Sequence, residues 1–478
     1  MALPANMVWE IRGSNGSDSN GGGFVPGSGG TDYSQQNAAQ YSGTNLVIGA
    51  TNTNVTSVSH SFISSDVGNI IQITAGTNFT TGFYEIVSVA SGIATLDRAC
   101  GTALASGGTW AEGGALATLN LVISRVTYNP APTPNGCTFW IQGTVTVSAT
   151  HLAEDAGWGF VIGYGTSRGD NNRATLQTTT AGVTIVEMYV PGGSWSFANI
   201  VFYHDVGSAT GYGFYDDGGG LNSLFFQNCV FGSSYHGVYT GGVIEHGYMF
   251  ACRVGATQSD GVSLNGNWTI VGSIIYYNTG SGIALPSTGG GGLCSVIKSV
   301  IYGNTGTAGI WASDDTANTM SIIISQCSIA SNTGDGVRIY GTGSLYFRSF
   351  ALDSSIIYGN GGYGINGPAL SGTINYGNIC QGRNNAFGDN TSGARNNLPT
   401  LPGDFTLSAN PFNNASGGDF SLNTTSGGGA ACREAGFPGT LEDLGTGYID
   451  VGALQSAAGG STTYVINKNV TLYQEEEP

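Results

Sequence analysis

The sequence has few charged residues and almost no lysine. Asp, Glu, Lys and Arg make up 9% of the 478 residues, whereas an ordinary domain has about 25%. The formal net charge is −17, and the two lysines, Lys298 and Lys468, lie far apart in the sequence. Binding to nucleic acid requires a cluster of Lys and Arg that displaces counterions, and binding to an anionic membrane requires the same. The composition argues against both partners.

Long apolar runs and closely spaced cysteines are also missing. No apolar run reaches the roughly 18 residues of a membrane-spanning helix, and the first residues do not show the basic and apolar segments of a signal peptide. The eight cysteines contain no C-x-x-C pair, which disfavours zinc-ribbon and thioredoxin chemistry. Isolated cysteines in apolar strands usually behave as small buried hydrophobes. We therefore expect no metal site and no cofactor.

Glycine is abundant, and it recurs in a pattern. There are 80 glycines among the 478 residues, well above the usual share of about 7%. A glycine followed by an apolar residue recurs every 21 to 28 positions, which indicates a repeat architecture. These pairs are Gly213-Phe214, Gly237-Val238, Gly261-Val262, Gly282-Ile283, Gly309-Ile310, Gly336-Val337 and Gly364-Ile365.

A second set of residues recurs at the same interval. It consists of isoleucines, each followed three residues later by an asparagine. The apolar stretches around them are short, rich in β-branched residues and bounded by turn residues, which predicts strands and not helices. Three short strands in about 25 residues are typical of one coil of a parallel β-helix, whereas a propeller blade needs about 40 residues. The isoleucines are Ile275, Ile301, Ile329 and Ile357, and the asparagines are Asn278, Asn304, Asn332 and Asn360.

The stacking of coils explains this repetition. Successive coils lie about 4.8 Å apart, so that equivalent residues stand above one another. Stacked isoleucines then fill the interior, and the four asparagines form a structural ladder of hydrogen bonds. The recurring glycines are expected to supply a positive φ or a tight bend at each corner.

The sequence predicts an all-β chain with five parts. Residues 1–112 lack the coil repeat but contain strand signals, including a hairpin of YEIVSV and IATLD, and predict a small β module for particle attachment or assembly. Residues 113–136 predict an amphipathic capping helix that covers the first coil and leads into it. Residues 137–400 form the parallel β-helix and 401–455 its C-terminal cap. Residues 456–478 contain one strand, which cannot be stable alone and is expected to pair between subunits.

Three segments carry a resemblance to a known superfamily. They are GSNGSDSNGGGF near the start, VIGYGTSRGDNNRATL at 161–176, and GDFSLNTTSGGGAACREAG with YIDVGALQ between 418 and 455. With the coil repeat, they resemble the right-handed parallel β-helix superfamily of pectate lyases, polygalacturonases and phage tailspikes, over roughly residues 115–455. The resemblance implies the fold and leaves the activity open, because this fold hosts unrelated functions.

The catalytic motifs of that superfamily are mostly missing. Polygalacturonases contain an Asp-Asp pair, a Gly-His-Gly and an Arg-Ile-Lys. This sequence has Asp-Asp at Asp216-Asp217 and Asp314-Asp315 but no Gly-His-Gly, and its VRIY at 337–340 lacks the lysine. The calcium-binding acidic cluster of pectate lyases is not recognisable either. An enzyme is therefore the less favoured interpretation, and it would be a glycoside hydrolase or a polysaccharide lyase.

The coil register nevertheless places polar and aromatic residues together. His236 and Asp260 precede their glycines on adjacent coils, about 5 Å apart, and glycoside hydrolysis uses two carboxyls about 5–9 Å apart. The catalytic candidates are therefore His236, Asp260, Asp216 and Asp217. Outward aromatic rings are platforms for sugar rings. The glycan-binding candidates are therefore Tyr215, Tyr239 and Trp311, together with Arg338, which occupies the same position in its coil. Both sets also fit a purely structural role, because turns favour Asp and stacked tyrosines stabilise sheets.

These features favour a bacteriophage virion structural protein: a fibre, a spike or a capsid decoration that displays a β-helix for attachment to a host surface or glycan. Such a protein assembles in the host cytoplasm and is released by lysis. Its partners would be other virion proteins, copies of itself and host-surface polysaccharide, without nucleic acid or membrane insertion. The resemblance to tailspikes implies a trimer.

Two other classes stay open. The first is a tailspike that depolymerises polysaccharide, as a hydrolase or a lyase. The second is a bacterial surface adhesin or filament subunit, located outside the cell at its surface.

Overall fold

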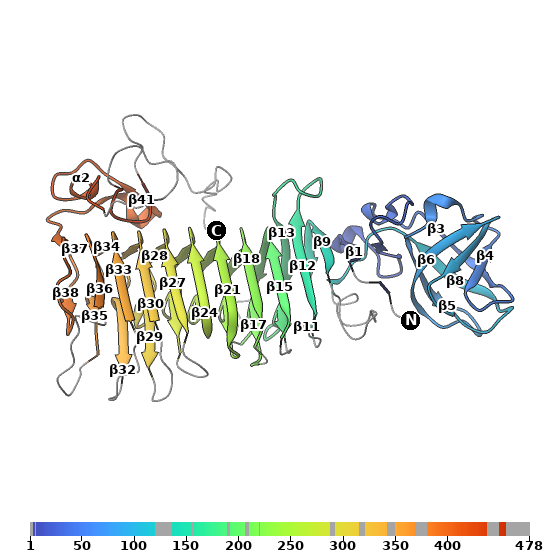
Figure 1. Cartoon of the computed structure of the whole chain (residues 1–478), viewed down its shortest axis with the longest axis horizontal. Coiled ribbons are helices and arrows are strands. Elements are labelled where there is room, and N and C mark those ends of the chain that lie inside the picture. Colours follow the sequence, from blue (N-terminus) through green and yellow to red (C-terminus); the bar gives the residue numbers. More distant parts are fainter. Residues whose placement is uncertain are drawn as a thin grey trace. The chain divides into compact units, whose positions relative to one another are not determined.

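The computed structural model describes residues 3–4, 6–119, 136–153, 157–188, 192–205, 210–218, 220–286, 292–314, 321–341, 349–368, 380–436 and 449–455. The chain divides into two compact units. Unit 1 contains Met1–Val206 and Phe214–Leu224, and unit 2 contains Gly207–Gly213 and Phe225–Pro478. Both are built mainly of strands (Figure 1). Within the described residues, no helix has the length and hydropathy needed to cross a membrane.

One part of unit 1 is a closed antiparallel barrel. Its strands follow the order β3-β4-β7-β6-β5-β8, and closure leaves no free edge. The predicted hairpin is confirmed, because β6 pairs antiparallel with β7. Aliphatic side chains, Tyr84 and Trp110 fill the barrel core. The strands are β3 (Tyr41–Ile48), β4 (Asn54–Ser57), β5 (Ile70–Ala75), β6 (Gly82–Ala90), β7 (Ile93–Leu96) and β8 (Ser106–Glu112).

The other part of unit 1 contains strands of three sheets, which are parallel except that β2 pairs antiparallel with β1. The first contains β2 (Gly23–Phe24), β1 (Val8–Ile11), β9 (Cys137–Gln142), β12 (Trp158–Tyr164) and β15 (Ser194–Ala198). The second contains β10 (Thr144–Thr146), β13 (Ala174–Thr178) and β16 (Ile200–His204), and the third β11 (His151–Ala153), β14 (Val186–Met188) and β17 (Phe214–Asp216). Strand β1 pairs parallel with β9. Residues 8–11 therefore belong to the first sheet and not only to the predicted N-terminal module.

A buried ionic cluster holds β1 in place. Glu10 is fully buried, and its carboxylate accepts hydrogen bonds from Arg168 at 2.7 and 2.9 Å and from Arg12 at 2.8 Å. Arg168 also bonds Asp32 at 2.9 Å, and the Tyr164 hydroxyl donates to Glu10. Such a carboxylate is tolerated in the interior because it is paired and hydrogen-bonded.

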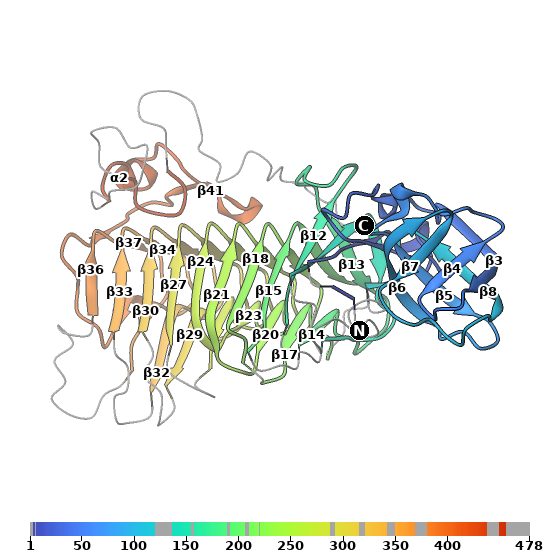
Figure 2. The ribbon, with the colours of Figure 1, turned by 45° about the vertical axis from the view of Figure 1, so that its right-hand side comes forward.

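Unit 2 consists of parallel coils, as Figure 1 shows for the first sheet, and the predicted parallel β-helix is confirmed. The first sheet contains β21 (Ile244–Phe250), β24 (Gly266–Val271), β27 (Leu293–Ile297), β30 (Ser321–Ser325), β33 (Ser349–Asp353) and β36 (Cys380–Arg383). The second contains β19 (Val230–Gly232), β22 (Arg253–Gly255), β25 (Ile274–Tyr276), β28 (Val300–Tyr302), β31 (Ser328–Ala330), β34 (Ile356–Tyr358), β37 (Ala386–Gly388) and β39 (Phe405–Thr406). The third contains β20 (Val238–Thr240), β23 (Val262–Ser263), β26 (Ile283–Leu285), β29 (Ala308–Asp314), β32 (Asp335–Gly341), β35 (Tyr363–Asn366) and β38 (Gly393–Asn396) (Figure 2).

The apolar residues after the recurring glycines form one wall of the core. In the third sheet each pairs with its counterpart on the next strand, in the order Val238, Val262, Ile283, Ile310, Val337 and Ile365. All six are buried. The register derived from the repeat is therefore confirmed over these coils.

The recurring glycines do not have the positive φ that the sequence analysis expected. Gly261 and Gly282 are absent from the positive-φ residues of the described chain; glycine is required there for close packing. A Cβ on Gly282 would lie 2.8 Å from Asn304 Nδ2 and 2.8 Å from the Gly309 carbonyl oxygen. Left-handed residues instead occupy two other bends of the coils. One lies between the first and second sheets, at Ala251, Gly272, Lys298, Gln326 and Ser354, and the other directly follows the second sheet, at Ala256, Tyr277, Gly303, Ser331 and Gly359.

The four predicted asparagines lie in one buried column after the strands of the second sheet. The Nδ2 group of each donates to Oδ1 of the next asparagine. Asn278 donates to Asn304 at 2.8 Å, Asn304 donates to Asn332 at 2.9 Å, and Asn332 donates to Asn360 at 3.0 Å. Asn360 continues to Asn390 at 2.9 Å. The backbone N–H of each also donates to the next Oδ1, at 3.1 Å.

The C-terminal segment folds back onto the outer face of the second sheet. Strands β40 (Phe412–Asn414) and β41 (Asp419–Leu422) pair antiparallel, and the short helix α2 (Gly429–Cys432) follows. Phe420 packs against Tyr302 with ring centroids 4.7 Å apart. The same apolar cluster includes Val300, Ala330, Ile356, Cys432 and Val451. The predicted capping helix falls largely on residues 120–135 and the predicted tail strand on 456–478, which lie outside the described residues.

Candidate functional site

The outer face of the third sheet in unit 2 carries most of the glycan-binding candidates. Side chains alternate along a strand, so Val238 and Thr240 point inward and Tyr239 points outward. The strand pairing places Tyr239, Ser263, Ala284, Trp311 and Arg338 in one column. Tyr239 and Trp311 are three strands apart, or about 14 Å. Tyr215 lies in unit 1, where it pairs with Glu187.

Three tyrosines surround His236 beside this column, and we call Tyr212, Tyr235, Tyr239 and His236 the tyrosine cluster. The His236 ring stacks on Tyr212 at 5.6 Å and 5°. It meets Tyr235 edge-on at 4.7 Å and Tyr239 at 5.4 Å. The three tyrosines are half-buried, so each presents part of its ring to solvent.

His236 is the buried centre of the tyrosine cluster. Its residue exposure is 6%, and burial lowers its pKa to about 4 against the opposing effect of a hydrogen bond with the Asp260 backbone. The imidazole is therefore neutral near pH 7. A neutral ring stacked among tyrosines acts as a positioning group for them and has little capacity to donate a proton.

Asp260 does not form an ion pair with His236. Its Oδ1 accepts a hydrogen bond from the Ser281 backbone N–H at 2.7 Å, and burial raises its pKa. The carboxylate closes the turn of the next coil. The structure places the two residues on adjacent coils, whose glycine backbones are bonded at 2.9 Å from Gly237 N to Gly261 O.

Asp216 and Asp217 point to opposite sides of β17. Asp216 is fully buried on the inner side, whereas Asp217 is exposed and accepts a hydrogen bond from the Tyr215 hydroxyl at 2.7 Å. Beside them, Glu187 has a raised pKa because of burial and of the Asp217 charge. Glu187 and Asp217 thus form an acidic pair with Tyr215 next to it.

Trp311 and Arg338 are neighbours in the column. They pair in register on β29 and β32, and Trp311 is half-buried. The Arg338 guanidinium lies 3.9 Å from Asp335, and the side chain is 39% exposed. Arg338 is therefore held loosely and can donate hydrogen bonds to an external ligand.

A second aromatic surface lies on the outer face of the first sheet. It contains Phe225 on β18 (Ser223–Gln227) and Tyr248 and Phe250 on β21, which are 42%, 38% and 45% exposed. We call these three residues the aromatic strip. The rings of Phe225 and Tyr248 stack at 4.5 Å and 13°. Contiguous exposed apolar surface commonly marks an interaction site.

Sequence reasoning missed several of these residues. Glu187 was not predicted as a site residue. Val186 pairs with Phe214 and occupies the equivalent position, but it is not preceded by the glycine that identified the other strands of this sheet. The aromatic strip was not predicted because the outward column was derived only for the strands that follow the recurring glycines, and Phe225, Tyr248 and Phe250 lie on strands of the first sheet. A usable signal exists in SLFFQ, where alternation places one of two adjacent phenylalanines outside.

Comparisons with known proteins give structural neighbours and no sequence relatives. No protein-family model matches the chain. A search of curated proteins gives no match either. The structure is similar to the pectate lyase Pel9A, with a TM-score of 0.48, 14% identity, and coverage of 71% of this chain and 91% of that one.

Two further solved structures are similar over a large part of the chain. The A-module of a mannuronan C-5 epimerase from Azotobacter vinelandii has a TM-score of 0.35 and 12% identity, covering 57% of this chain and 91% of its own. The tailspike of Acinetobacter baumannii bacteriophage AP22, solved with a capsular saccharide, has a TM-score of 0.29 and 10% identity, covering 78% of this chain and 64% of its own.

Proposed function

We propose that the protein is a structural component of a bacteriophage virion that displays a β-helix and binds host-surface polysaccharide through the tyrosine cluster. The observation that carries the proposal is the arrangement of Tyr212, Tyr235 and Tyr239 around His236, with centroid separations from the histidine of 4.7–5.6 Å. Tyrosine combines an apolar ring with a hydroxyl, and suits a ligand whose faces are apolar and whose edges are hydroxyls. Pyranose rings have this character.

The rigidity of the site favours binding. Tyr239 lies on a strand, and the histidine in the centre limits the movement of the surrounding rings. A site that is ordered before the ligand arrives loses less entropy on binding. Trp311 and Arg338 extend the same face along the stack of coils, so that a polymer can contact more than one sugar platform.

The cysteines agree with assembly in a reducing compartment. All eight are buried thiols outside any disulfide, and burial raises the pKa of Cys294 and of Cys327 to about 12. Buried thiols of this kind persist in the cytoplasm, whereas secreted proteins usually carry disulfides. A virion protein folds in the cytoplasm and needs no oxidising compartment before lysis releases it.

The aromatic strip is proposed as a contact between copies of the chain. Its three rings are exposed to nearly half of their area, and aromatic residues are enriched in the centres of protein interfaces. A homo-oligomer, with a trimer as the expectation, would cover them and leave the tyrosine cluster on another face.

Binding is tested with purified bacterial surface polysaccharides. The full-length protein is applied to a panel of capsular polysaccharides and lipopolysaccharides, and Tyr239→Ala and Tyr212→Ala are compared with the wild type on each ligand that binds. Each variant should weaken binding at least about fivefold, since one aromatic platform contributes about 1–3 kcal/mol when bases stack on it. Tyr203→Ala is the matched control, because Tyr203 is an exposed tyrosine of the second sheet, outside the face that carries the cluster, Trp311 and Arg338. Equal binding by all four proteins would contradict the proposal.

A second candidate function, cleavage of the polysaccharide, rests on Glu187 and Asp217. The geometry of parallel strands separates these residues by about 8 Å at Cα, and the Asp217 charge acts on the Glu187 carboxyl, so the two carboxyls lie on the same side of the sheet and close together. Paired carboxyls of this kind hydrolyse glycosides. The raised pKa of Glu187 suits the general acid and the exposed Asp217 the base. Incubation of the bound polysaccharide should then release reducing ends, and Glu187→Gln should abolish this without changing binding. No release by the wild type would exclude this alternative and leave the binding function intact.

A further inference from the structure

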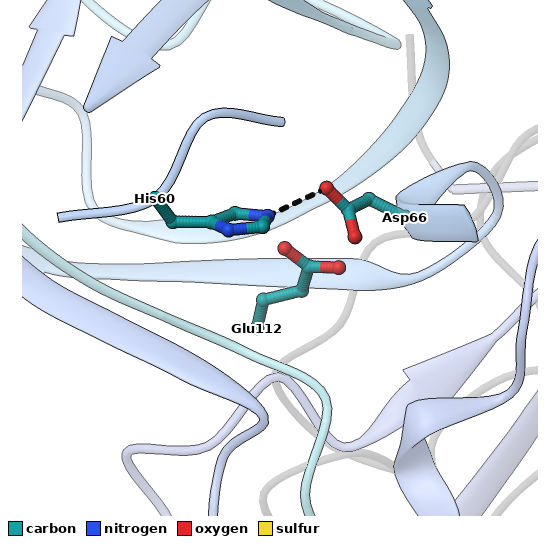
Figure 3. Close-up of side chains that lie close together, drawn as sticks. All are labelled: His60, Asp66 and Glu112. Atoms are coloured by element: carbon teal, nitrogen blue, oxygen red, sulfur yellow. Dashed lines mark hydrogen bonds and ion pairs between the residues drawn. The ribbon is translucent and has the colours of Figure 1, made fainter. Parts of the chain in front are cut away.

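Three ligand-type side chains meet inside the barrel of unit 1. They are His60, which follows β4, Asp66 at the end of the 3-10 helix η3 (Ser64–Asp66), and Glu112 at the end of β8. One potential metal-ligand atom from each residue lies within 4.8 Å of the other two. Figure 3 shows the Glu112 carboxylate directed toward the other two side chains. The cluster is distinct from the tyrosine cluster and from the acidic pair of Glu187 and Asp217.

His60 and Asp66 are held in place by other contacts. His60 Nε2 lies 2.7 Å from Asp66 Oδ2, which also accepts the Ile63 backbone N–H at 2.8 Å. The imidazole stacks on Tyr41 at 3.5 Å and 11°, and its edge meets Phe62 at 5.2 Å. These contacts fix the direction of the imidazole nitrogen and of the Asp66 carboxylate before any ligand is present.

Glu112 has no such partner. The residue is fully buried, and neither of its carboxylate oxygens has a hydrogen-bond partner; the same holds for Asp66 Oδ1. Buried polar groups are nearly always hydrogen-bonded, and an unpaired buried carboxylate is strongly destabilising. With a neutral His60, the two carboxylates carry a formal charge of −2, which one divalent cation would balance.

We propose that His60, Asp66 and Glu112 bind a divalent transition-metal ion, preferentially Zn²⁺. One imidazole nitrogen and two carboxylate oxygens are a donor set that zinc accepts. Calcium and magnesium favour six or more ligands, all of them oxygen. The ion joins the loop that contains His60 and Asp66 to the last residue of β8, whose neighbours are Tyr41 on β3 and Ile71 on β5. It therefore acts as a structural clamp at the point where three segments of the barrel meet.

No sequence pattern indicates this site, because its members are separated by 6 and 46 positions, from His60 to Asp66 and from Asp66 to Glu112. Neither interval matches a metal-binding motif. Only closure of the barrel brings Glu112 to the other two residues.

The test uses the full-length chain after dialysis against EDTA. Titration with ZnCl₂ should show one ion per chain by calorimetry and elemental analysis, and the melting temperature should rise by at least about 4 °C. Glu112→Gln keeps the shape of the side chain and removes its charge; it should weaken zinc binding at least tenfold and abolish the rise in melting temperature. Glu85→Gln is the control, because Glu85 is a carboxylate of the same barrel outside the cluster, and it should bind zinc as the wild type does.

Two results would overturn the proposal. The first is a wild-type chain that takes up no stoichiometric zinc and melts at the same temperature with and without it. The second is a Glu112→Gln variant that binds zinc as tightly as the wild type. Where Glu112→Gln does not fold, the Co²⁺-loaded wild type replaces it as the readout: visible d–d bands with nitrogen and oxygen ligation are expected, and a spectrum of hydrated Co²⁺ alone would contradict the site.

Discussion

The side chain of Asn278 donates a hydrogen bond to Asn304 Oδ1 at 2.8 Å, and the Asn278 backbone N–H donates to the same oxygen at 3.1 Å. Each asparagine of the ladder thus satisfies two donors of its neighbour. The Asn304 Nδ2 group also lies 3.4 Å from the Ile275 carbonyl oxygen. The Asn304 side-chain amide therefore bonds the turn of the previous coil, at Asn278 and Ile275, and also the next coil, at Asn332.

Removal of one asparagine should therefore be costly. Asn304→Ala leaves two donors of Asn278 without partners in the interior and removes one of the two donors to Asn332 Oδ1, and we expect a loss of about 3 kcal/mol in unfolding free energy. Urea denaturation of the full-length chain measures it. Asn413→Ala is the control, since Asn413 is an exposed asparagine bonded only to Ser421 among the described residues, and it should change stability by less than about 0.5 kcal/mol. Equal effects of the two substitutions would mean that the ladder is not a stabilising element.

The glycine beside the ladder should be equally intolerant. A methyl group at Gly282 would meet Asn304 Nδ2, the Gly309 carbonyl oxygen and Ile301 Cγ2, each at 2.8 Å. Gly282→Ala should cost about 1–3 kcal/mol through overpacking, measured by the same denaturation experiment. Ser281→Ala, one position earlier, adds no atom and should be nearly neutral. A stable Gly282→Ala protein would show that the coils can separate enough to admit a methyl group.

The repeat carried the register of the coils because stacking imposes the same residue at the same position in each one. For this reason Val238, Val262 and Ile283 could be aligned from the sequence alone. The reason for the glycines could not be obtained in this way, since a positive φ and a close contact both select glycine. Strand β1 was also missed, because Val8–Ile11 is separated from β9 by the whole barrel and shows no repeat that would connect them.

Acid should destabilise the tyrosine cluster through His236. Its pKa in the folded chain is about 4, and about 6.5 in the unfolded chain. Between these pH values the unfolded chain binds the proton and the folded chain does not. The contribution of the neutral His236 to the unfolding free energy is therefore fully present above pH 6.5 and is lost as the pH falls through 4. The loss can reach about 3 kcal/mol.

The variant His236→Phe keeps a ring in the centre of the cluster and removes the proton-binding group. Urea denaturation at pH 7 and at pH 4.5 should show a smaller loss of stability for the variant than for the wild type. Polysaccharide binding by the wild type should stay constant from pH 6 to pH 8, because the histidine remains neutral there. Parallel pH dependences of stability in the two proteins would place the acid sensitivity elsewhere.

The aromatic strip should control the oligomeric state. Substitution of Tyr248→Ser together with Phe250→Ser removes two of its three rings, and we expect light scattering with size-exclusion chromatography to show a shift toward the monomer. Tyr340→Ala, an exposed aromatic residue outside the strip, should leave the mass unchanged. A wild type that is already monomeric at micromolar concentration, or a double variant that keeps the wild-type mass, would rule out the strip as the contact.

The sequence predicts which residues of the candidate site share one face, but it does not predict the hydrogen bonds that their side chains form. Register alone placed Tyr239, Trp311 and Arg338 on one face, because two residues after each glycine the side chain points outward. Whether His236 and Asp260 would share a proton depends on the direction of each side chain in the turn. The Asp260 carboxylate accepts a hydrogen bond from the Ser281 backbone, and the spacing of residues in the sequence does not predict this orientation of the side chain.

The hairpin of β40 and β41 shields one flank of the coils from contact with other molecules. Phe412 and Phe420 cover Tyr302 and Tyr358 there. If copies of the chain associate through the aromatic strip of the first sheet, as proposed above, this hairpin on the second sheet lies away from the contact between them. A fluorophore on an exposed residue of the hairpin, such as Asn413, should then label the chain without changing its oligomeric state.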